Sequence, residues 1–344
     1  MAGRTRDFLH TIWSTKGLAR YMFWAGAAIT AVFVVCAIFA PWIAPYGFDQ
    51  TSAHGVNFPK LGPYDSHHLL GTNDQFYDIA SRMIWGARTG IEVVILSVIL
   101  AGLIGVPLGL LSGFVGGWVD RVLVFLMDAL YAFPSLLLAI VFSFLLKGKL
   151  GSGILAAALS LTAIYIPQYF RVVRNTTVSA REATYVEAAR AIGARPMTIM
   201  RKYLFSNVVQ SVPVLATLNA ADALGTLAAL GFLGLGIQPT EASEWGYDLS
   251  RALDDAQGGN WLPAFWPGLM IVLLITALTL VGEGLNETVN PALRRRRLKP
   301  VVFSARVPAD VAATGPSGGT HGVLDGPEDR PDDRPGGGHE EAPT

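Results

Sequence analysis

The chain contains a single cysteine, few charged residues and no excess of either sign of charge. With Cys36 as its only thiol, it cannot form an internal disulfide or a metal site built from several cysteines. Charged residues make up 15% of the 344 residues, and 26 basic side chains balance 26 acidic ones. This balance gives no reason to expect nucleic acid as a partner. Hydrophobic residues make up 51%, and the mean hydropathy of +0.42 is too high for a soluble domain of this length.

The apolar residues gather in six runs that approach the length needed to cross a bilayer. A helix that spans the hydrocarbon core needs about 20 mainly apolar residues. The runs cover residues 22–43, 91–115, 122–146, 154–170, 208–237 and 263–282. The first run is too long for the apolar part of a cleavable signal peptide, and no small-residue cleavage pattern follows it. The sequence therefore predicts an all-α, polytopic membrane protein with six transmembrane helices.

Basic residues beside these runs predict the orientation of the chain. Lysine and arginine near the ends of membrane spans stay on the cytoplasmic side. They concentrate before the first run, between the fourth and fifth runs, and at Arg294–Arg297, so six spans place both termini in the cytoplasm. The predicted parts are a cytoplasmic arm (1–20), a transmembrane domain (21–290) with an extracytoplasmic loop (44–90) and a cytoplasmic insert (171–207), and a basic stop with a disordered cytoplasmic tail (291–344).

Four glycines recur at every fourth position from the second run onward: Gly105, Gly109, Gly113 and Gly117. They form a flat stripe on one face of a helix, which allows the backbone of another helix to approach closely. We therefore expect the second span to lie inside a bundle. Its partner is either another span of this chain or a span of a second subunit.

Two acidic residues lie inside apolar runs, Asp128 in the third and Asp222 in the fifth. A charged side chain at the centre of a membrane helix costs about 2.5–3.5 kcal/mol on insertion scales. Both carboxylates are therefore expected to face the bundle or an aqueous pathway, either as structural hydrogen-bonding groups or as groups that line the pathway. A proton relay would need partners at matching depth, and the six runs contain no histidine.

Residues 67–88 lie just before the second run and predict a short amphipathic helix from Asp78 onward. Its apolar residues fall on one face, with Arg82 and Arg88 on the opposite face. The adjacent His67 and His68 point in different directions and lack a suitably spaced third ligand. We therefore predict no metal site in this segment.

The insert between the fourth and fifth runs carries seven basic residues, which makes its burial in the membrane too costly. Its stretch from Arg181 to Ile192 is rich in alanine and favours a helix, which Gly193 and Pro196 end. A second helix can begin at Met197. The insert is expected either to form a rigid knob that contacts another protein or to lie as an amphipathic loop on lipid headgroups.

Within the insert stand Tyr185 and the pattern Glu187-Ala188-Ala189, followed after three residues by Gly193. At these residues the chain resembles the inner-membrane permease subunits of binding-protein-dependent ABC importers. Other stretches resemble the C-type subunit of the dipeptide/oligopeptide permease family: LGTND, PSLLLAI from Pro134, GFLGLGIQP from Gly231 and VGEGLNETVNPALR at the end of the last run. The resemblance covers residues 17–297 and leaves out the tail.

The resemblance implies the type I fold of ABC importer permeases and a bacterial inner-membrane location. It also implies several partners: a homologous second permease subunit, two cytoplasmic ATPase subunits or one fused ATPase, an extracytoplasmic substrate-binding protein, and membrane lipid. Residues Tyr185, Glu187, Ala188, Ala189 and Gly193 would then contact an ATPase subunit. ATP and Mg would bind to the ATPase partners, because this chain has no GxxxxGK[ST] phosphate-binding motif. The chain itself is therefore expected to bind no cofactor and to catalyse no reaction.

The cargo is less closely specified than the fold. The family usually has Gly-Arg where this chain has Phe76-Tyr77, and it has a Gly-Asp-Gly-Leu-Arg-Asp stretch where this chain has Gly282-Glu-Gly-Leu-Asn-Glu287. The resemblance favours di- or oligopeptides, with nickel, glutathione, haem or another small solute as alternatives. Two other classes lack support. An ion-coupled secondary carrier would show matched half-repeats and charge pairs within the membrane, and we find neither. A membrane scaffold would have no need for the knob.

Overall fold

The structure, a computed structural model, describes residues 18–146 and 148–289. The chain divides into two units, Met1–Arg295 and Arg296–Thr344, and only the first contains described residues. Most of the predicted N-terminal arm and all of the predicted tail, including Arg294–Arg297, lie outside the described residues.

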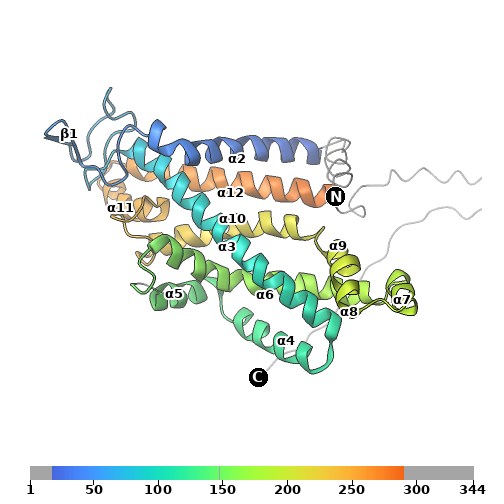
Figure 1. The fold of residues 1–344 in the computed structure, drawn as a ribbon. Coiled ribbons are helices and arrows are strands. Elements are labelled where there is room, and N and C mark those ends of the chain that lie inside the picture. The colour runs from blue at the N-terminus through green and yellow to red at the C-terminus, as the bar shows by residue number, and fades with distance from the viewer. Residues whose placement is uncertain (1–17, 147, 290–344) are drawn as a thin grey trace, which may run out of the picture. The chain divides into compact units, whose positions relative to one another are not determined.

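The described residues of the first unit form helices and one very short antiparallel pair of strands (Figure 1). The long helices are α2 (Leu18–Ile43), α3 (Ile79–Val115), α6 (Gly153–Arg181), α10 (Val212–Phe232) and α12 (Leu262–Val289). The others are α4 (Gly117–Tyr131), α5 (Ser135–Leu146), α7 (Thr184–Ala191), α8 (Pro196–Thr198), α9 (Phe205–Val208), α11 (Trp245–Gln257) and the π-helical turn η1 (Ile199–Leu204), and the strands are β1 (Ser52–Ala53) and β2 (Val56–Asn57). The all-α membrane fold predicted from the sequence is confirmed.

Five helices are long and apolar enough to cross a membrane, and a sixth candidate span is a bent pair, α4 and α5. The two members of this pair meet at an angle of 93°, where the sequence predicted one continuous span. Pro134 explains the break, because proline lacks a backbone N–H and disfavours helical geometry in the residue before it. The described spans therefore number five, or six if the bent pair counts as one.

Two helices are longer than the predicted spans. α3 contains 37 residues, so the predicted amphipathic helix and the second span form one continuous helix. Its N-terminus is capped by Asp78, whose carboxylate accepts a hydrogen bond from the Ser81 N–H at 2.7 Å. α6 runs on to Arg181 and does not end at Phe170, where the apolar run ends. At about 1.5 Å per residue, both helices are longer than the hydrocarbon core of about 30 Å.

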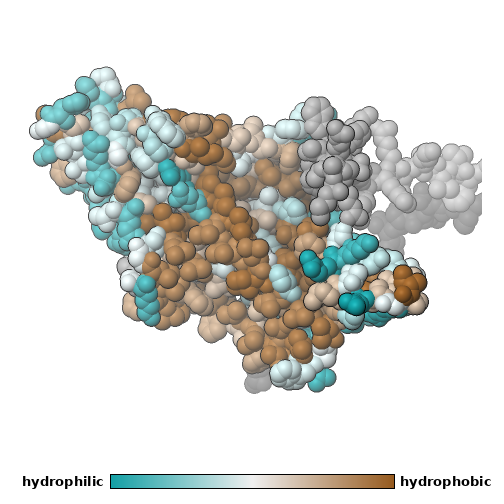
Figure 2. Space-filling model, viewed as in Figure 1, coloured by the Kyte–Doolittle hydropathy of each residue, from teal (hydrophilic) through white to brown (hydrophobic). Residues whose placement is uncertain are grey.

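The helices pack around the contact between α3 and α6. α2 lies beside α12, and α10 packs against both α12 and α6 (Figure 1). α11 and the two strands lie near one end of the spans, and α7 to α9 lie near the other. In the view of Figure 2, hydrophobic residues cover the middle of the helices, while hydrophilic residues gather at these two ends. This is the surface pattern of a membrane-spanning protein.

Candidate functional site

α7 is a short helix with a well-defined end. Its last turn stops where Gly193 adopts a φ of +78°, a conformation that residues with a side chain rarely take. The Gly193 N–H donates to the Arg190 carbonyl at 2.9 Å, and the Ala194 N–H donates to the Ala189 carbonyl at 3.0 Å. These bonds satisfy carbonyls that a helix end would otherwise leave unpaired. The sequence therefore fixes both the length of α7 and the direction of the chain that leaves it.

The two faces of α7 differ in their surroundings. Val186 and Ala189 are buried and belong to the hydrophobic core that also contains Ile199 and Leu204 of η1. On the other face Tyr185, Glu187 and Ala188 are exposed, as is Gly193 beyond the helix. The expectation that Ala189 contacts a partner is therefore wrong, because this side chain packs against its own chain. The remaining four residues form one accessible surface, which we call the α7 face.

Two arginines of the predicted insert lie on α6 and pair with acids of α4. The Arg174 guanidinium donates to both carboxylate oxygens of Asp120, at 2.6 and 2.7 Å. Arg171 donates to Asp128 at 2.7 Å and also lies 4.0 Å from the centre of the Tyr131 ring. Asp128 is thus an exposed, ion-paired group that links α4 to α6. Arg171, the first residue of the predicted insert, thus still belongs to the long helix α6.

Three of the four stripe glycines bring α3 against α6. A Cβ atom added at Gly105, Gly109 or Gly113 would lie 2.6–2.8 Å from a carbonyl oxygen of α6. No side chain fits at such distances, so only glycine allows the two backbones to approach this closely. The stripe therefore packs within this chain. Gly117 does not continue it, because α3 ends at Val115 and Gly117 begins α4 with a φ of +62° and no atom near its Cβ position.

Asp222 lies at the midpoint of α10 and is exposed on the surface of the chain. Its carboxylate accepts a hydrogen bond from the Tyr165 hydroxyl of α6 at 2.8 Å. It lines a surface hollow of about 520 Å³ together with Thr226 and residues of α5, α10 and α12. The sequence identified the carboxylate as a polar group of the bundle or pathway. It did not identify Tyr165 as its partner, because a tyrosine in an apolar run gives no sign of which helix it faces.

A buried ion pair joins the start of α3 to α11. Arg82 and Asp248 are 1% and 6% exposed, and the Arg82 Nε donates to both carboxylate oxygens at 2.8 and 2.9 Å. The guanidinium also donates to the Phe48 carbonyl at 2.9 Å. The sequence placed Arg82 on the face opposite the apolar residues, and the structure shows that this part of the face is buried. A helical periodicity shows which residues share a face, but it does not show that α11 covers that face.

The N-terminus of α11 holds a second buried acid, Glu244. Its carboxylate accepts hydrogen bonds from the N–H groups of Gly246 and Tyr247, both at 2.8 Å. Burial nevertheless raises the pKa of Glu244 to about 8, from an ordinary value of 4.5, and outweighs these two bonds and the nearby Arg82. Glu244 lies in the connection between α10 and α12, outside the spanning helices.

The raised pKa of Glu244 predicts a pH dependence of stability. Between pH 4.5 and about 8 the folded protein keeps a proton that the unfolded chain releases, so its stability falls as the pH rises through this interval. Glu244→Gln should flatten this fall. Midpoints of thermal unfolding at about pH 5 and about pH 8 measure the effect, and a difference of about 1 kcal/mol corresponds to roughly 2–4 °C. An equal pH dependence in the wild type and the variant would contradict the assignment.

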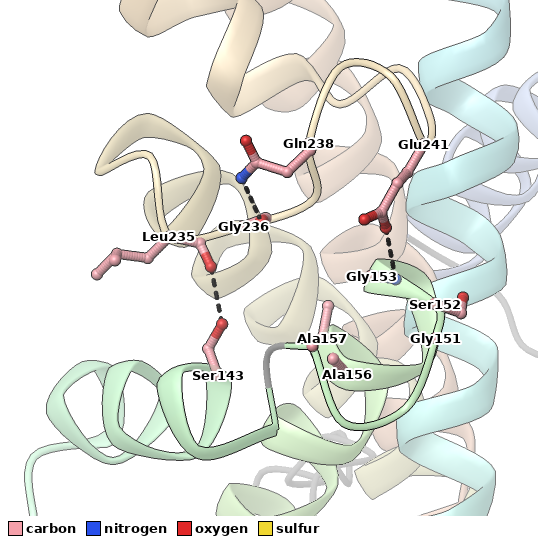
Figure 3. Close-up of a pocket in the computed structure, with 11 residues that line it drawn as sticks. Ser143, Gly151, Ser152, Gly153, Ala156, Ala157, Leu235, Gly236, Gln238 and Glu241 are labelled. Atoms are coloured by element: carbon pink, nitrogen blue, oxygen red, sulfur yellow. Dashed lines mark hydrogen bonds between the residues drawn. The ribbon is translucent and has the colours of Figure 1, made fainter.

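Figure 3 shows a small pocket where the connection after α10 meets α5 and α6. The pocket has a volume of about 160 Å³. The Ser143 hydroxyl donates to the Leu235 carbonyl at 2.7 Å, and Glu241 accepts from the Gly153 N–H at 2.6 Å. These bonds attach the connection to one helix on each side of the pocket. The chain leaves α10 through a turn in which Gly234 has a φ of +72°.

His68 of the histidine pair is buried and lies 3.0 Å from the Asp78 carboxylate that caps α3. His67 is exposed. Among residues 18–146 and 148–289, no group of three or more His, Cys, Asp or Glu side chains is placed to hold a metal ion. The geometry gives His68 a structural contact in the loop before α3.

Comparison with known proteins agrees with this arrangement of helices. Residues 105–295 match the family described as binding-protein-dependent transport system inner membrane component, and residues 18–63 match the N-terminal transmembrane domain of oligopeptide transport permease C. The di/tripeptide transport system permease protein DppC of Pseudomonas aeruginosa (strain UCBPP-PA14) is 34% identical over 78% of this chain and 88% of that protein. The glutathione transport system permease protein GsiD of Pectobacterium atrosepticum is 33% identical over 78% of this chain and 87% of that protein.

A solved structure of the MetNI methionine ABC transporter, in an inward-facing conformation, has a similar fold. It matches with a TM-score of 0.50 and 21% sequence identity, over 61% of this chain and 96% of that one. At this identity the likeness concerns the fold alone, which is that of type I ABC importer permeases.

The fold and its apolar helices define a multi-pass membrane protein. The chain belongs to the family of inner-membrane components of binding-protein-dependent transport systems. The resemblance to the dipeptide/oligopeptide type of ABC permease, noted from the sequence, is confirmed. The chain is thus a subunit of an ABC importer in the inner membrane.

Proposed function

We propose that this chain forms half of the translocation pathway of an ATP-driven importer and receives the motion of an ATPase through the α7 face. The observation that carries the proposal is the two-sided character of α7. One side presents Tyr185, Glu187 and Ala188 to the surroundings, and the other fixes the helix to the chain through the buried Val186 and Ala189. A helix held in this way can transmit a force applied to its free side.

The connections of α7 support a path for that force. Only two residues separate the end of α6 from the start of α7, and η1, on which α7 packs, leads through α9 into α10. Leu204 and Val208 are buried in the same hydrophobic core as Val186. A displacement of α7 would therefore move α6 and α10 together as rigid elements. Rigid-body movement of this kind underlies switching between two facing states.

The proposed assembly contains a homologous second permease subunit, two ATPase subunits or one fused ATPase, and an extracytoplasmic binding protein. Both termini and the α7 face lie in the cytoplasm in this assembly, in agreement with the basic residues near α7. ATP and Mg bind to the ATPase subunits, so the chain moves cargo without catalysing a reaction itself. The membership of the chain in a binding-protein-dependent transport family supports this composition.

The proposed cargo is a di- or oligopeptide. The relative from Pseudomonas aeruginosa carries a name for di- and tripeptide transport and shares 34% of its aligned residues with this chain. Glutathione is a second candidate, because the relative from Pectobacterium atrosepticum is named for glutathione transport at 33% identity. Both candidates are short peptides, and the match to the N-terminal domain of an oligopeptide permease favours the same class.

The variant Glu187→Lys tests the role of the α7 face. Because Glu187 is exposed, the substitution should leave folding and membrane insertion unchanged. It should weaken binding of the ATPase or lower its substrate-stimulated hydrolysis about tenfold, which corresponds to about 1.4 kcal/mol of lost interaction. Co-purification and ATP hydrolysis of the complete importer are the measurements.

Glu182→Lys provides a matched control. Glu182 is also exposed and undergoes the same change of charge, but it precedes α7. We expect the control to retain ATPase binding and stimulated hydrolysis. If Glu187→Lys behaves like the control, α7 does not couple this chain to the ATPase.

A further inference from the structure

Asp222 has an unusual position for an acidic residue of a membrane helix. It lies at the midpoint of α10, and its side chain is exposed on the chain surface. A carboxylate facing lipid at this depth would cost about 2.5–3.5 kcal/mol. Asp120 and Asp128 each have an arginine partner, whereas Asp222 has no basic partner among residues 18–146 and 148–289. The surface around Asp222 is therefore suited to water or a polar ligand and unsuited to lipid.

The hollow at Asp222 is large enough for a small organic molecule. Its volume of about 520 Å³ lies within the range of about 300–1,000 Å³ that is usual for ligand sites. Among the described residues that line it, Asp222 is the only charged one. Polar hydroxyls come from Thr226 and Thr279, and the remaining lining residues are apolar or glycine: Leu136, Leu218, Ala221, Gly225, Ala229 and Ile275. The hollow thus combines one negative charge with apolar walls.

Tyr165 holds the carboxylate in place and leaves part of it free. The hydroxyl donates to one carboxylate oxygen, Oδ2, at 2.8 Å, and no residue in the described part of the chain donates to the second oxygen. A carboxylate can accept several hydrogen bonds, so the free oxygen can accept from a ligand.

One turn away, two more polar side chains lie between α6 and α10. The Tyr169 hydroxyl interacts with the Asn219 side chain, and both residues are buried, at 1% and 4% exposed. Asn219 precedes Asp222 by three residues and therefore lies on the same side of α10. Tyr169 and Asn219 thus continue the polar contact that Tyr165 and Asp222 make between the two helices.

We infer that Asp222 binds the primary ammonium group of the cargo as it passes along α10, while Tyr165 orients the carboxylate. The inference rests on the proposed function, since it takes the hollow as part of the translocation pathway. An ammonium group offers three hydrogen-bond donors and one positive charge, which match the free oxygen and charge of Asp222. A metal cation fits less well, because the described residues provide no cluster of three ligands. The site would therefore select cargo with a free amine, as in peptides with an unblocked N-terminus.

The test uses the complete importer in proteoliposomes, with trialanine as the probe. A carbodiimide joins a carboxylate to a primary amine that contacts it, and mass spectrometry of the α10 peptide then locates the product. We expect trialanine attached at Asp222 in the wild type. No such product should form with Asp222→Asn or with N-acetyltrialanine, which has no free amine.

Transport provides the second measurement. Asp222→Asn should lower trialanine uptake about tenfold, while ATP hydrolysis stimulated by the loaded binding protein changes less than about twofold. Asp128→Asn is the matched control, because it removes a carboxylate that pairs with Arg171 and does not line the hollow, and it should retain uptake. Tyr165→Phe should lower uptake less than Asp222→Asn does, since the carboxylate remains.

Four results would overturn the inference or its basis. Two of these results would show that the carboxylate does not bind the amine. In one, Asp222→Asn takes up trialanine as fast as the wild type. In the other, the wild-type importer transports trialanine but forms no product at Asp222. If Asp222→Asn lowered uptake and stimulated hydrolysis equally, Asp222 would act in coupling and not in binding the amine. The proposed function would remain valid. Absence of ATP-dependent trialanine uptake by the wild type would contradict the proposed peptide importer, and the inference with it.

Discussion

Replacing Arg82 with methionine is expected to destabilise the protein by about 3–5 kcal/mol, because the substitution leaves Asp248 buried without its partner. The two side chains are 1% and 6% exposed, and the closest nitrogen and oxygen of the pair lie 2.6 Å apart. Arg82 also donates to the Phe48 carbonyl, so the same variant frees the loop before α3. Thermal unfolding of the purified protein in detergent measures the loss.

Two further variants separate the buried charge from the mere loss of an arginine. Arg88→Met removes an arginine from the same helix, but Arg88 pairs with Glu92 at the surface. This variant should therefore lose less than about 1 kcal/mol of stability. Combining Arg82→Met with Asp248→Leu removes both charges and should recover much of the stability that Arg82→Met loses. Equal midpoints for Arg82→Met and Arg88→Met would contradict the burial of the pair.

The contact between α3 and α6 predicts the second large effect. Gly109→Ala should destabilise the protein by about 1–3 kcal/mol, because the new Cβ cannot be accommodated without separating the two backbones. That atom would lie 2.6 Å from the Phe170 carbonyl oxygen and 3.0 Å from the Val173 Cβ. The yield of folded protein and its unfolding midpoint in detergent are the measurements.

Gly102→Ala is the control for this prediction. Gly102 lies on the same helix, but the nearest atoms to its added Cβ are those of the Tyr169 ring at 3.9 Å, which is ordinary contact. We expect this variant to be as stable as the wild type, or slightly more so because alanine favours helix over glycine. If both variants are equally stable, the close approach of α3 and α6 at Gly109 does not exist.

The sequence predicted those features of the fold that arise from periodicity and from single residues. Long apolar runs identified the spans, and the glycine repeat identified the packed face of α3. The end of α7 followed from Gly193, since the structure ends the helix at Ala191 and gives the glycine a positive φ. The break at Pro134 could also have been predicted, because proline is a local signal. It was missed because the residues on both sides are apolar and were read as one continuous span.

Contacts between distant segments could not be predicted from the sequence. Arg82 and Asp248 are separated by 166 residues, and nothing local to either one indicates the other. The same holds for Tyr165 and Asp222, which lie on different helices. The extent of α6 was missed for another reason. Its arginines suggested a loop outside the membrane, whereas their charges are matched by Asp120 and Asp128 on α4, which allows the helix to continue.

Uptake of trialanine by proteoliposomes separates an ATP-driven permease from an ion-coupled carrier. The liposomes contain this chain with its second permease subunit and ATPase, and receive the loaded binding protein from the side that would be extracytoplasmic. We expect uptake only when ATP and the binding protein are both present, and no uptake when a proton or sodium gradient replaces ATP. Uptake driven by an ion gradient, with the ATPase left out, would contradict the assignment of this chain as an ABC importer subunit.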